Sequence, residues 1–390
     1  MPEAALPRLL YLGDVPVEAS YHGSALIYRL LQRYPADRLA IVESNLFTPG
    51  TDRRLPGVRH HTLTIGRRRL LHSRLHAWYS RWLLAGAGRR AARVRAMLDV
   101  FSPQAVLTVA HGYTWVTAAR YAERAGLPLH LIVHDDWPRV APARHIVERY
   151  FTRIYRQAAS RLCVSPSMAE EYARRYGPAG TVLLPARAPD ARVFDGVAAR
   201  LRGAAGGPVF AFAGTINSSG YVRLLQQLAE QLARHDGTLL IFGPLTPAQA
   251  ADAGLTAANI TIMGLLPSSG LLERLRTDAD VLFVPMSFAD ADRSNMRMSF
   301  PSKLTDYTAV GLPLLICGPV DCSAVRWAHE NDGVAEVVTS EDAAAMRAAV
   351  DRLCSDRDLR LRLAGTAQLV GNRDFSADRA EAILHAALVA

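Results

Sequence analysis

The feature that most constrains the fold is an alternation of short apolar runs with helical stretches, which occurs twice along the 390 residues. Apolar runs of about five residues suit strands buried on both faces of a parallel sheet, and helices return the chain to the starting edge. The strands of the first half are expected near residues 8–12, 39–43, 58–65, 105–109, 129–133, 161–164 and 181–184. Those of the second half are expected near residues 209–213, 238–242, 260–263, 280–284, 313–317 and 334–338. The pattern predicts an α/β protein with two doubly wound parallel sheets.

The length also favours two domains, because single domains seldom reach this size. We place the first domain at residues 1–190, a linker rich in Ala, Arg, Gly and Pro at 191–207, and the second domain at 208–372. The helices of the first half are expected near residues 24–34, 70–98, 114–125, 143–158 and 166–176. Ligands of doubly wound sheets bind beyond the carboxyl ends of the strands. Two such sheets facing each other would therefore bind a ligand in the cleft between them.

Several patterns indicate a cytoplasmic protein. No apolar run approaches the ~20 residues that span a bilayer. The first apolar run lacks a preceding basic stretch, so we expect a strand there and not a signal peptide. The four cysteines fit neither a zinc spacing nor a dense disulfide scaffold.

The net charge of +9 is concentrated in one segment. Between Arg53 and Leu98 there are twelve arginines and no acidic residue. A single basic block suggests one docking face, and no aromatic-basic platform for nucleic acid accompanies it. Within the segment, apolar side chains fall on one face of a helix: Leu71, Leu75, Trp78, Trp82 and Ala85. This helix would either lie on an anionic membrane surface or bury the apolar face as core, with the arginines as a solvated rim.

Two loops of the first half follow expected strands. His22 and Gly23 precede an expected helix, where a glycine lets backbone N–H groups approach an anion. His134, Asp135 and Asp136 follow the strand near 129–133. A histidine there could donate a hydrogen bond to a ligand. A simple strand-to-helix turn and a structural histidine are the alternatives.

The strongest motif is in the second half, where residues 300–313 read FPSKLTDYTAVGLP. Ser302 is expected to cap a helix whose first turn contains Lys303, and Asp306 shares a face with that lysine. Lys303 is the single lysine beside forty-four arginines. This exception favours a site that fits a compact ammonium and not a planar guanidinium. A cation and a carboxylate placed together would suit a phosphate and a ribose diol.

Four features of the second half, in order, resemble the nucleotide-binding domain of GT-B glycosyltransferases, especially glycosyltransferase family 4. They lie at residues 214–220 (GTINSSG), 239–244, 259–264 and 279–313. The first half is similar to the acceptor domain of that family in its pattern and in Gly23 and His134. The resemblance implies a GT-B fold, in which two Rossmann-like domains face a cleft. It also implies retention at the anomeric carbon, no metal, and a C-terminal helix within 373–390 that crosses back to the first domain.

The resemblance assigns catalytic roles to His134 and Lys303, and acceptor-side positions to His22, Asp135 and Asp136. The residues expected to bind the nucleotide-sugar are Gly23, Gly214, Thr215, Ser218, Ser219, Gly243, Arg297, Ser299, Phe300, Ser302, Lys303 and Asp306. The sequence also departs from the family pattern. Thr215 and Ser219 replace the usual Arg and Lys, and Met298 replaces the first of two glutamates, which leaves Lys303 with Arg293 or Arg297 to neutralise phosphates.

The sequence therefore predicts a metal-independent glycosyltransferase that uses a nucleoside diphosphate-sugar and no cofactor. Its acceptor would be a glycan, a small molecule or a lipid-linked compound of cell-surface polysaccharide or glycoconjugate synthesis. A sugar-nucleotide epimerase of the same fold and a non-catalytic binding or scaffold protein are the alternatives. Asp290 and Asp292 resemble the Asp-x-Asp metal site of the other large glycosyltransferase fold, but that fold has one nucleotide-binding sheet and not two. His72 and His76 could ligate zinc at their spacing of four residues, but no third ligand is evident nearby.

Overall fold

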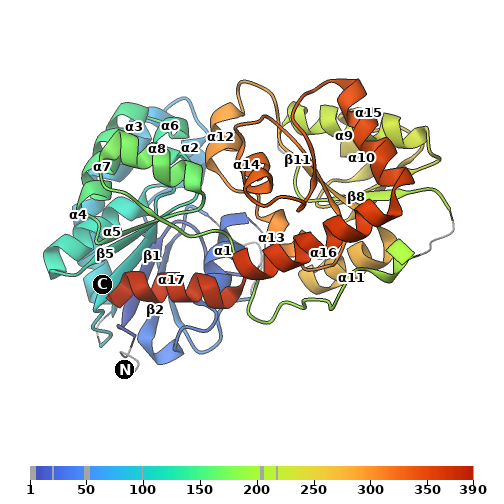
Figure 1. The fold of residues 1–390 in the computed structure, drawn as a ribbon. Helices are drawn as coiled ribbons and strands as arrows, with labels where there is room; N and C mark the ends of the chain where they lie inside the picture. The colour runs from blue at the N-terminus through green and yellow to red at the C-terminus, as the bar shows by residue number, and fades with distance from the viewer. Residues whose placement is uncertain are drawn as a thin grey trace. The chain divides into compact units, whose positions relative to one another are not determined.

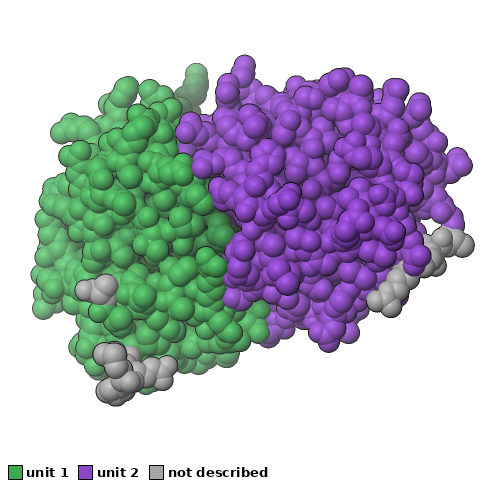
Figure 2. All heavy atoms as spheres, in the orientation of Figure 1, with its two compact units in different colours: residues 1–189, 377–390 green, residues 190–376 purple. Residues whose placement is uncertain are grey.

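The computed structural model describes residues 6–19, 22–47, 53–98, 100–202, 206–216 and 218–389. The chain divides into two compact units, which Figure 2 shows in different colours. Unit 1 comprises Met1–Pro189 and Ala377–Ala390, and unit 2 comprises Asp190–Ser376.

Within its described residues, unit 1 contains a seven-stranded parallel sheet in the order β3-β2-β1-β4-β5-β6-β7. Its central strands are apolar and buried on both faces, because helices cover both sides of a doubly wound sheet. The strands are β1 (Leu9–Gly13), β2 (Leu39–Ser44), β3 (Arg59–Leu63), β4 (Ala105–Val109), β5 (Leu129–Val133), β6 (Ser160–Cys163) and β7 (Thr181–Val182). All the strands expected in the first half are confirmed.

The helices of unit 1 connect these strands. They are α1 (His22–Leu31), α2 (Arg68–Leu71), α3 (His76–Ala85), α4 (Ala87–Leu98), α5 (Thr114–Ala125), α6 (Trp137–Val140), α7 (Arg144–Gln157), α8 (Pro166–Tyr176) and α17 (Ala377–Val389). The C-terminal helix α17 packs against α1, as the red and blue ribbons in Figure 1 show. Its side chains Leu384 and Leu388 belong to the unit 1 core.

Unit 2 repeats the architecture with a six-stranded parallel sheet among its described residues, in the order β10-β9-β8-β11-β12-β13. The strands are β8 (Val209–Ala213), β9 (Thr238–Phe242), β10 (Ile260–Gly264), β11 (Val281–Pro285), β12 (Leu314–Cys317) and β13 (Glu336–Val338). The helices are α9 (Ser219–Ala233), α10 (Pro247–Asp252), α11 (Ser268–Asp278), α12 (Arg293–Met298), α13 (Lys303–Tyr307), α14 (Ser323–Glu330), α15 (Ala343–Ser355) and α16 (Arg357–Asp374). The second parallel sheet is thus confirmed as well.

The described part of residues 191–207, predicted as a linker, lies within unit 2. The ring of Phe194 is buried beneath the guanidinium of Arg276, which is 4.7 Å from the ring centroid. Gln368 of α16 donates a hydrogen bond to the Phe194 carbonyl oxygen. These contacts attach the segment to α11 and α16, which the composition of the segment did not indicate.

The single helix expected near 70–98 is instead three helices, α2, α3 and α4. Ser73 makes the first break, because its hydroxyl donates to the Leu70 carbonyl and accepts from the Leu75 N–H. Such local side-chain bonds compete with the helical hydrogen bonds of the backbone. Gly86 separates α3 from α4. The helical period continues across both breaks, so periodicity alone did not reveal them.

Candidate functional site

Two glycines follow neighbouring strands at the carboxyl edge of the unit 2 sheet. Gly214 follows β8 with a φ of +149°, and Gly243 follows β9 with a φ of +153°. Glycine adopts such values without steric cost. A Cβ atom on Gly243 would lie 2.4 Å from the Gly214 carbonyl oxygen. The two loops therefore approach more closely than a side chain at 243 would allow, at the edge where doubly wound sheets bind ligands.

Lys303 begins α13 and extends toward Gly214. Its Nζ atom lies 4.3 Å from the ring centroid of Phe212 and 5.4 Å from that of Tyr221. A Cβ atom on Gly214 would lie 3.5 Å from the same nitrogen. Burial lowers the pKa of Lys303 to about 7, and no ion pair within the described residues opposes this shift. An anion beside Gly214 would thus meet a cation whose charge no carboxylate compensates.

Tyr307 fixes α13 against the end of β8. The N–H of Ala213 donates a hydrogen bond of 2.5 Å to the Tyr307 hydroxyl, which lies 3.3 Å from the Ala213 carbonyl oxygen. Tyr307 is buried. Because Ala213 directly precedes Gly214, these bonds hold the turn that carries Lys303 beside the loop that follows β8.

The loop after Gly214 leads into the N-terminus of α9. Ser218 is the N-cap residue, and its buried Oγ has no hydrogen-bond partner among the described residues. Ser219 opens the helix and is exposed, and Thr215 is partly buried. Free N–H groups and the helix dipole favour an anion at such an end. The structure therefore brings Gly214, Thr215, Ser218 and Ser219 to the end of one strand, with Lys303 beside the first of them.

The remaining residues predicted for this site differ in their placement. Asp306 lies on α13 one turn after Lys303, and its Oδ1 is 3.4 Å from Thr305 Oγ1. Arg297 on α12 is exposed. Ser299 follows α12, and its hydroxyl donates to Asn295 Oδ1 at 2.7 Å.

Ser302 and Phe300, which lie just before α13, have surroundings that the sequence did not predict. Ser302 occupies the N-cap position, but its side chain makes no capping hydrogen bond. Its φ of −57° and ψ of −22° are helical, whereas a capping residue is normally extended. Phe300, predicted to bind the nucleotide-sugar, packs against Trp327 and Phe375 in the interior of unit 2.

A second polar group lies at the carboxyl edge of the unit 1 sheet. His134 and Asp135 follow β5, and His111 follows the adjacent strand β4. His134 Nε2 is 3.2 Å from Asp135 Oδ2, and His111 Nδ1 is 3.4 Å from the same oxygen. Burial raises the pKa of Asp135, but the two imidazoles more than offset this and hold its pKa well below the usual range. Sequence reasoning missed His111, which lies two residues after β4, because the sequence did not show that β4 and β5 are neighbours.

Gly23 makes room for His134 at the start of α1. A Cβ atom on Gly23 would lie 2.8 Å from His134 Cε1 and 3.3 Å from His134 Nδ1. A side chain at position 23 would therefore clash with the imidazole of His134, and glycine avoids this clash. His22 opens α1, and its side chain lies outside the described part of the structure.

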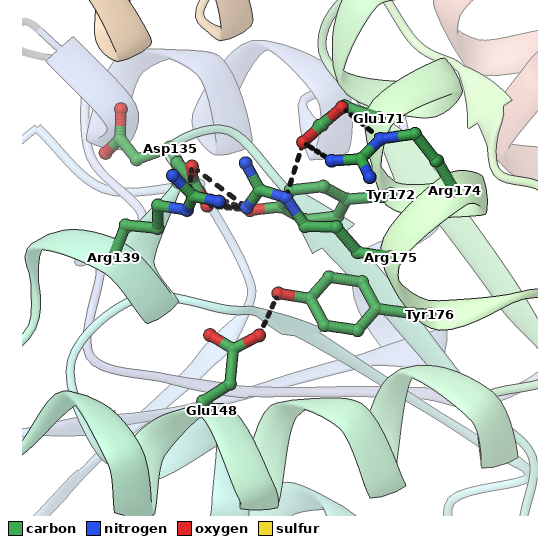
Figure 3. Close-up of polar contacts among 9 residues, drawn as sticks. Asp135, Arg139, Glu148, Glu171, Tyr172, Arg174, Arg175 and Tyr176 are labelled. Atoms are coloured by element: carbon green, nitrogen blue, oxygen red, sulfur yellow. Dashed lines mark hydrogen bonds and ion pairs between the residues drawn. The ribbon is translucent and has the colours of Figure 1, made fainter.

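The adjacent carboxylates Asp135 and Asp136 have different surroundings. Asp136 is buried and accepts hydrogen bonds from Arg175 at 3.0 and 3.1 Å and from the Tyr172 hydroxyl at 2.9 Å. Arg175 also donates to Glu171 at 2.7 Å. Figure 3 shows this network, with the labelled Asp135 carboxylate turned away from it. Asp136 thus ties the loop after β5 to α8, whereas Asp135 faces the two histidines.

The basic segment presents apolar side chains to solvent. Leu75, Trp78 and Trp82 are 59%, 63% and 53% exposed, and we call these three residues the α3 stripe. The alternative prediction, that this face of the helix is buried in the core, is therefore wrong for the α3 stripe. Arg90, one of the twelve arginines that the second alternative places on a solvated rim, is instead buried and donates to Thr117 Oγ1 and the Leu83 carbonyl oxygen. Among the described residues, no helix is long and apolar enough to cross a membrane.

Comparison with known proteins connects both units to one class of enzyme. Residues 27–185 match the family model described as Glycosyltransferase Family 4, and residues 207–356 match that described as Glycosyl transferases group 1. The chain is a glycosyltransferase with the GT-B fold. A search of curated proteins found no match.

Solved structures share the fold of this glycosyltransferase over nearly its whole length. HepE from Anabaena, solved with UDP and glucose, is 13% identical with a TM-score of 0.69, over 98% of this chain and 100% of HepE. Sucrose-phosphate synthase from Thermosynechococcus elongatus is 14% identical with a TM-score of 0.67, over 96% of this chain and 97% of its own. Trehalose 6-phosphate synthase from Burkholderia multivorans is 15% identical with a TM-score of 0.64, over 97% of each chain.

Proposed function

We propose that this glycosyltransferase uses a nucleoside diphosphate-sugar donor and binds its nucleotide at the carboxyl edge of the unit 2 sheet. The observation that carries the proposal is the position of Lys303 beside Gly214, close to the loop that enters α9. The diphosphate would lie against Lys303 and the N–H groups at the start of α9. Asp306 would accept hydrogen bonds from the ribose hydroxyls. The UDP bound to HepE, a protein of the same fold, supports this class of donor.

The reaction we propose proceeds with retention and needs no metal at the diphosphate. The bond between the anomeric carbon and the diphosphate oxygen breaks, and the acceptor oxygen bonds to that carbon on the same face. The departing phosphate oxygen takes the proton of the acceptor hydroxyl. Lys303 and the α9 N-terminus stabilise the negative charge that develops on the diphosphate. His134 is assigned a hydrogen bond to the sugar.

The test is to measure release of nucleoside diphosphate with and without acceptor, after a thermal-shift screen has selected the nucleotide. A transferase releases the diphosphate at a rate that depends on the acceptor, whereas an epimerase needs no acceptor. Lys303→Arg at saturating donor should lower turnover by about ten- to a thousandfold with an unchanged melting temperature. Full turnover of this variant would remove Lys303 from the phosphate site.

We further propose that the acceptor is lipid-linked, in cell-surface polysaccharide or glycoconjugate synthesis, and that the enzyme docks on the cytoplasmic face of an anionic membrane. The exposed α3 stripe and the arginines between Arg53 and Leu98, apart from the buried Arg90, support this. Interfacial helices combine such apolar and basic faces. Each basic residue near the surface contributes about 1 kcal/mol, and salt screens this attraction.

Sedimentation with vesicles tests the docking. Wild-type protein should bind vesicles that contain anionic lipid, and binding should decrease as salt rises. Replacing Trp78 and Trp82 by Ala should release the protein, whereas Leu265→Ala, at a side chain 61% exposed in unit 2, should not. Equal binding to neutral vesicles, or equal effects of the two changes, would contradict this assignment.

A further inference from the structure

We propose that His111, His134 and Asp135 form a binding site for a divalent transition metal ion of the zinc class. In the part of the chain that the structure describes, these residues are the one group of three His, Cys, Asp or Glu whose donor atoms all lie within 4.8 Å of one another. The metal-like sequence pairs Asp290/Asp292 and His72/His76 do not belong to such a group. The inference concerns unit 1 and does not depend on the identity of the donor.

Two of the three separations between the donors match a tetrahedral site. Zinc bonds to imidazole nitrogen and carboxylate oxygen are about 2.0–2.2 Å long, which places neighbouring ligands roughly 3.3 Å apart. Asp135 Oδ2 lies 3.2 Å from His134 Nε2 and 3.4 Å from His111 Nδ1. The donor atoms of the two histidines lie within 4.8 Å of each other.

The imidazole nitrogens of the cluster are not all satisfied by the described protein atoms. One carboxylate oxygen faces two imidazole nitrogens at distances longer than the 2.7–2.9 Å typical of charge-assisted hydrogen bonds. The buried Nδ1 atoms of His111 and His134 have no hydrogen-bond partner among the described residues. A cation between the three groups would use His111 Nδ1 and compensate the carboxylate charge at the same time.

The surroundings suit a site with one open position. The side chains of His134, His111 and Asp135 are 10%, 25% and 39% exposed. Solvent and a metal ion therefore have partial access to the cluster. The ring centroid of Trp137 lies 4.5 Å from that of His111. Three protein ligands with a free fourth position are typical of zinc that also binds an oxygen of a substrate or water. Two histidines and one carboxylate suit zinc, iron(II) or cobalt(II) better than calcium or magnesium.

If Nε2 of His134 binds the metal ion, the proton of the imidazole lies on Nδ1, which faces Gly23 at the start of α1. This Nδ1 atom is buried and has no hydrogen-bond partner among the described residues. Metal binding and the proposed contact with the sugar are therefore alternative uses of the His134 side chain.

The experiment titrates the full-length, chelator-treated protein with zinc chloride alone in a calorimeter. Cobalt(II) is added in parallel, because its visible absorption distinguishes tetrahedral from octahedral coordination. We expect one tight zinc per chain, a tetrahedral cobalt spectrum, and a higher melting temperature with zinc. His111→Ala and Asp135→Asn should each weaken binding by at least about a hundredfold, since even outer partners of metal ligands are worth 10–100-fold.

His76→Ala is the matched control, because it removes an exposed histidine that stands four residues from His72 on the basic segment. It should leave zinc affinity unchanged. Asp135→Asn keeps the size of the side chain, so it tests the site even if His111→Ala fails to fold. Absence of stoichiometric zinc binding by the wild type would overturn the proposal. So would binding that survives Asp135→Asn or that His76→Ala abolishes.

Discussion

The amino group of Lys303 should take up a proton when a nucleoside diphosphate binds. In the free protein, burial against Phe212 and Tyr221 lowers the pKa of this group from 10.5 to about 7. A diphosphate at Gly214 would place negative charge beside the nitrogen and so favour its charged form. We therefore expect the bound nucleotide to restore a pKa near the ordinary value.

The size of the effect follows from the two pKa values. At pH 8.5 about 3% of the free protein would carry a charged Lys303, against about 99% of the complex. Binding at this pH should then take up close to one proton. At pH 6 about nine-tenths of the free protein already carries a charged Lys303, so the uptake by this group should fall to about 0.1 proton. Between pH 8 and 10 the affinity should fall by about tenfold per pH unit.

The assay is calorimetric titration with UDP at pH 8.5 in two buffers that differ in ionisation enthalpy. The difference in observed heat gives the number of protons exchanged. Lys303→Met retains much of the apolar side chain and should bind more weakly, with no uptake. Binding of UDP to the wild type with the same heat in both buffers would refute the reasoning, because a lysine with a pKa of about 7 must gain charge beside a diphosphate at this pH.

Two further predictions concern affinity and stability. Asp306→Ala should weaken nucleotide binding by about 2–4 kcal/mol, roughly 30- to 1000-fold, because the ribose loses a charged hydrogen-bond acceptor. The free energy of unfolding should change by under ~1 kcal/mol. Unchanged affinity in a calorimetric titration would exclude Asp306 from the site. Arg175→Met should lower the free energy of unfolding by about 3–5 kcal/mol in urea, because it removes the guanidinium that pairs with the buried Asp136 carboxylate at 3.0 Å. The control Arg120→Met breaks an exposed pair with Glu123 and should cost under ~1 kcal/mol; equal losses would contradict the role given to burial.

Much of the candidate site could be predicted because backbone geometry and local order determine it. A strand that ends in glycine and leads into a helix indicates a carboxyl-edge loop wherever it occurs, and Gly214 followed such a strand. Lys303 was identified by composition, as the single lysine of the chain. His111 was missed because a histidine after a strand has no meaning until the neighbouring strand is known. The adjacency of β4 and β5 places it opposite Asp135.

Other features depended on which surfaces find a partner in the folded chain. The α3 stripe has the periodicity of a core helix, yet Trp78 and Trp82 remain exposed because no element of unit 1 covers them among the described residues. Phe300 lies in the strongest sequence motif, but Trp327 and Phe375 bury its ring. Periodicity defines a face of a helix and does not say what that face contacts.

The sequence alone determined the two parallel sheets. Continuous apolar runs that alternate with helices have few other ways to pair their backbone N–H and C=O groups and to bury both faces of each strand. It also determined the loops that end those strands. Only the tertiary structure decided the pairings across the chain: Lys303 beside Gly214, Tyr307 bonded to Ala213, and Asp135 between two histidines. Each of these joins residues from different strands or helices. Their proximity follows from strand order and side-chain packing, which are properties of the whole domain and not of any local segment.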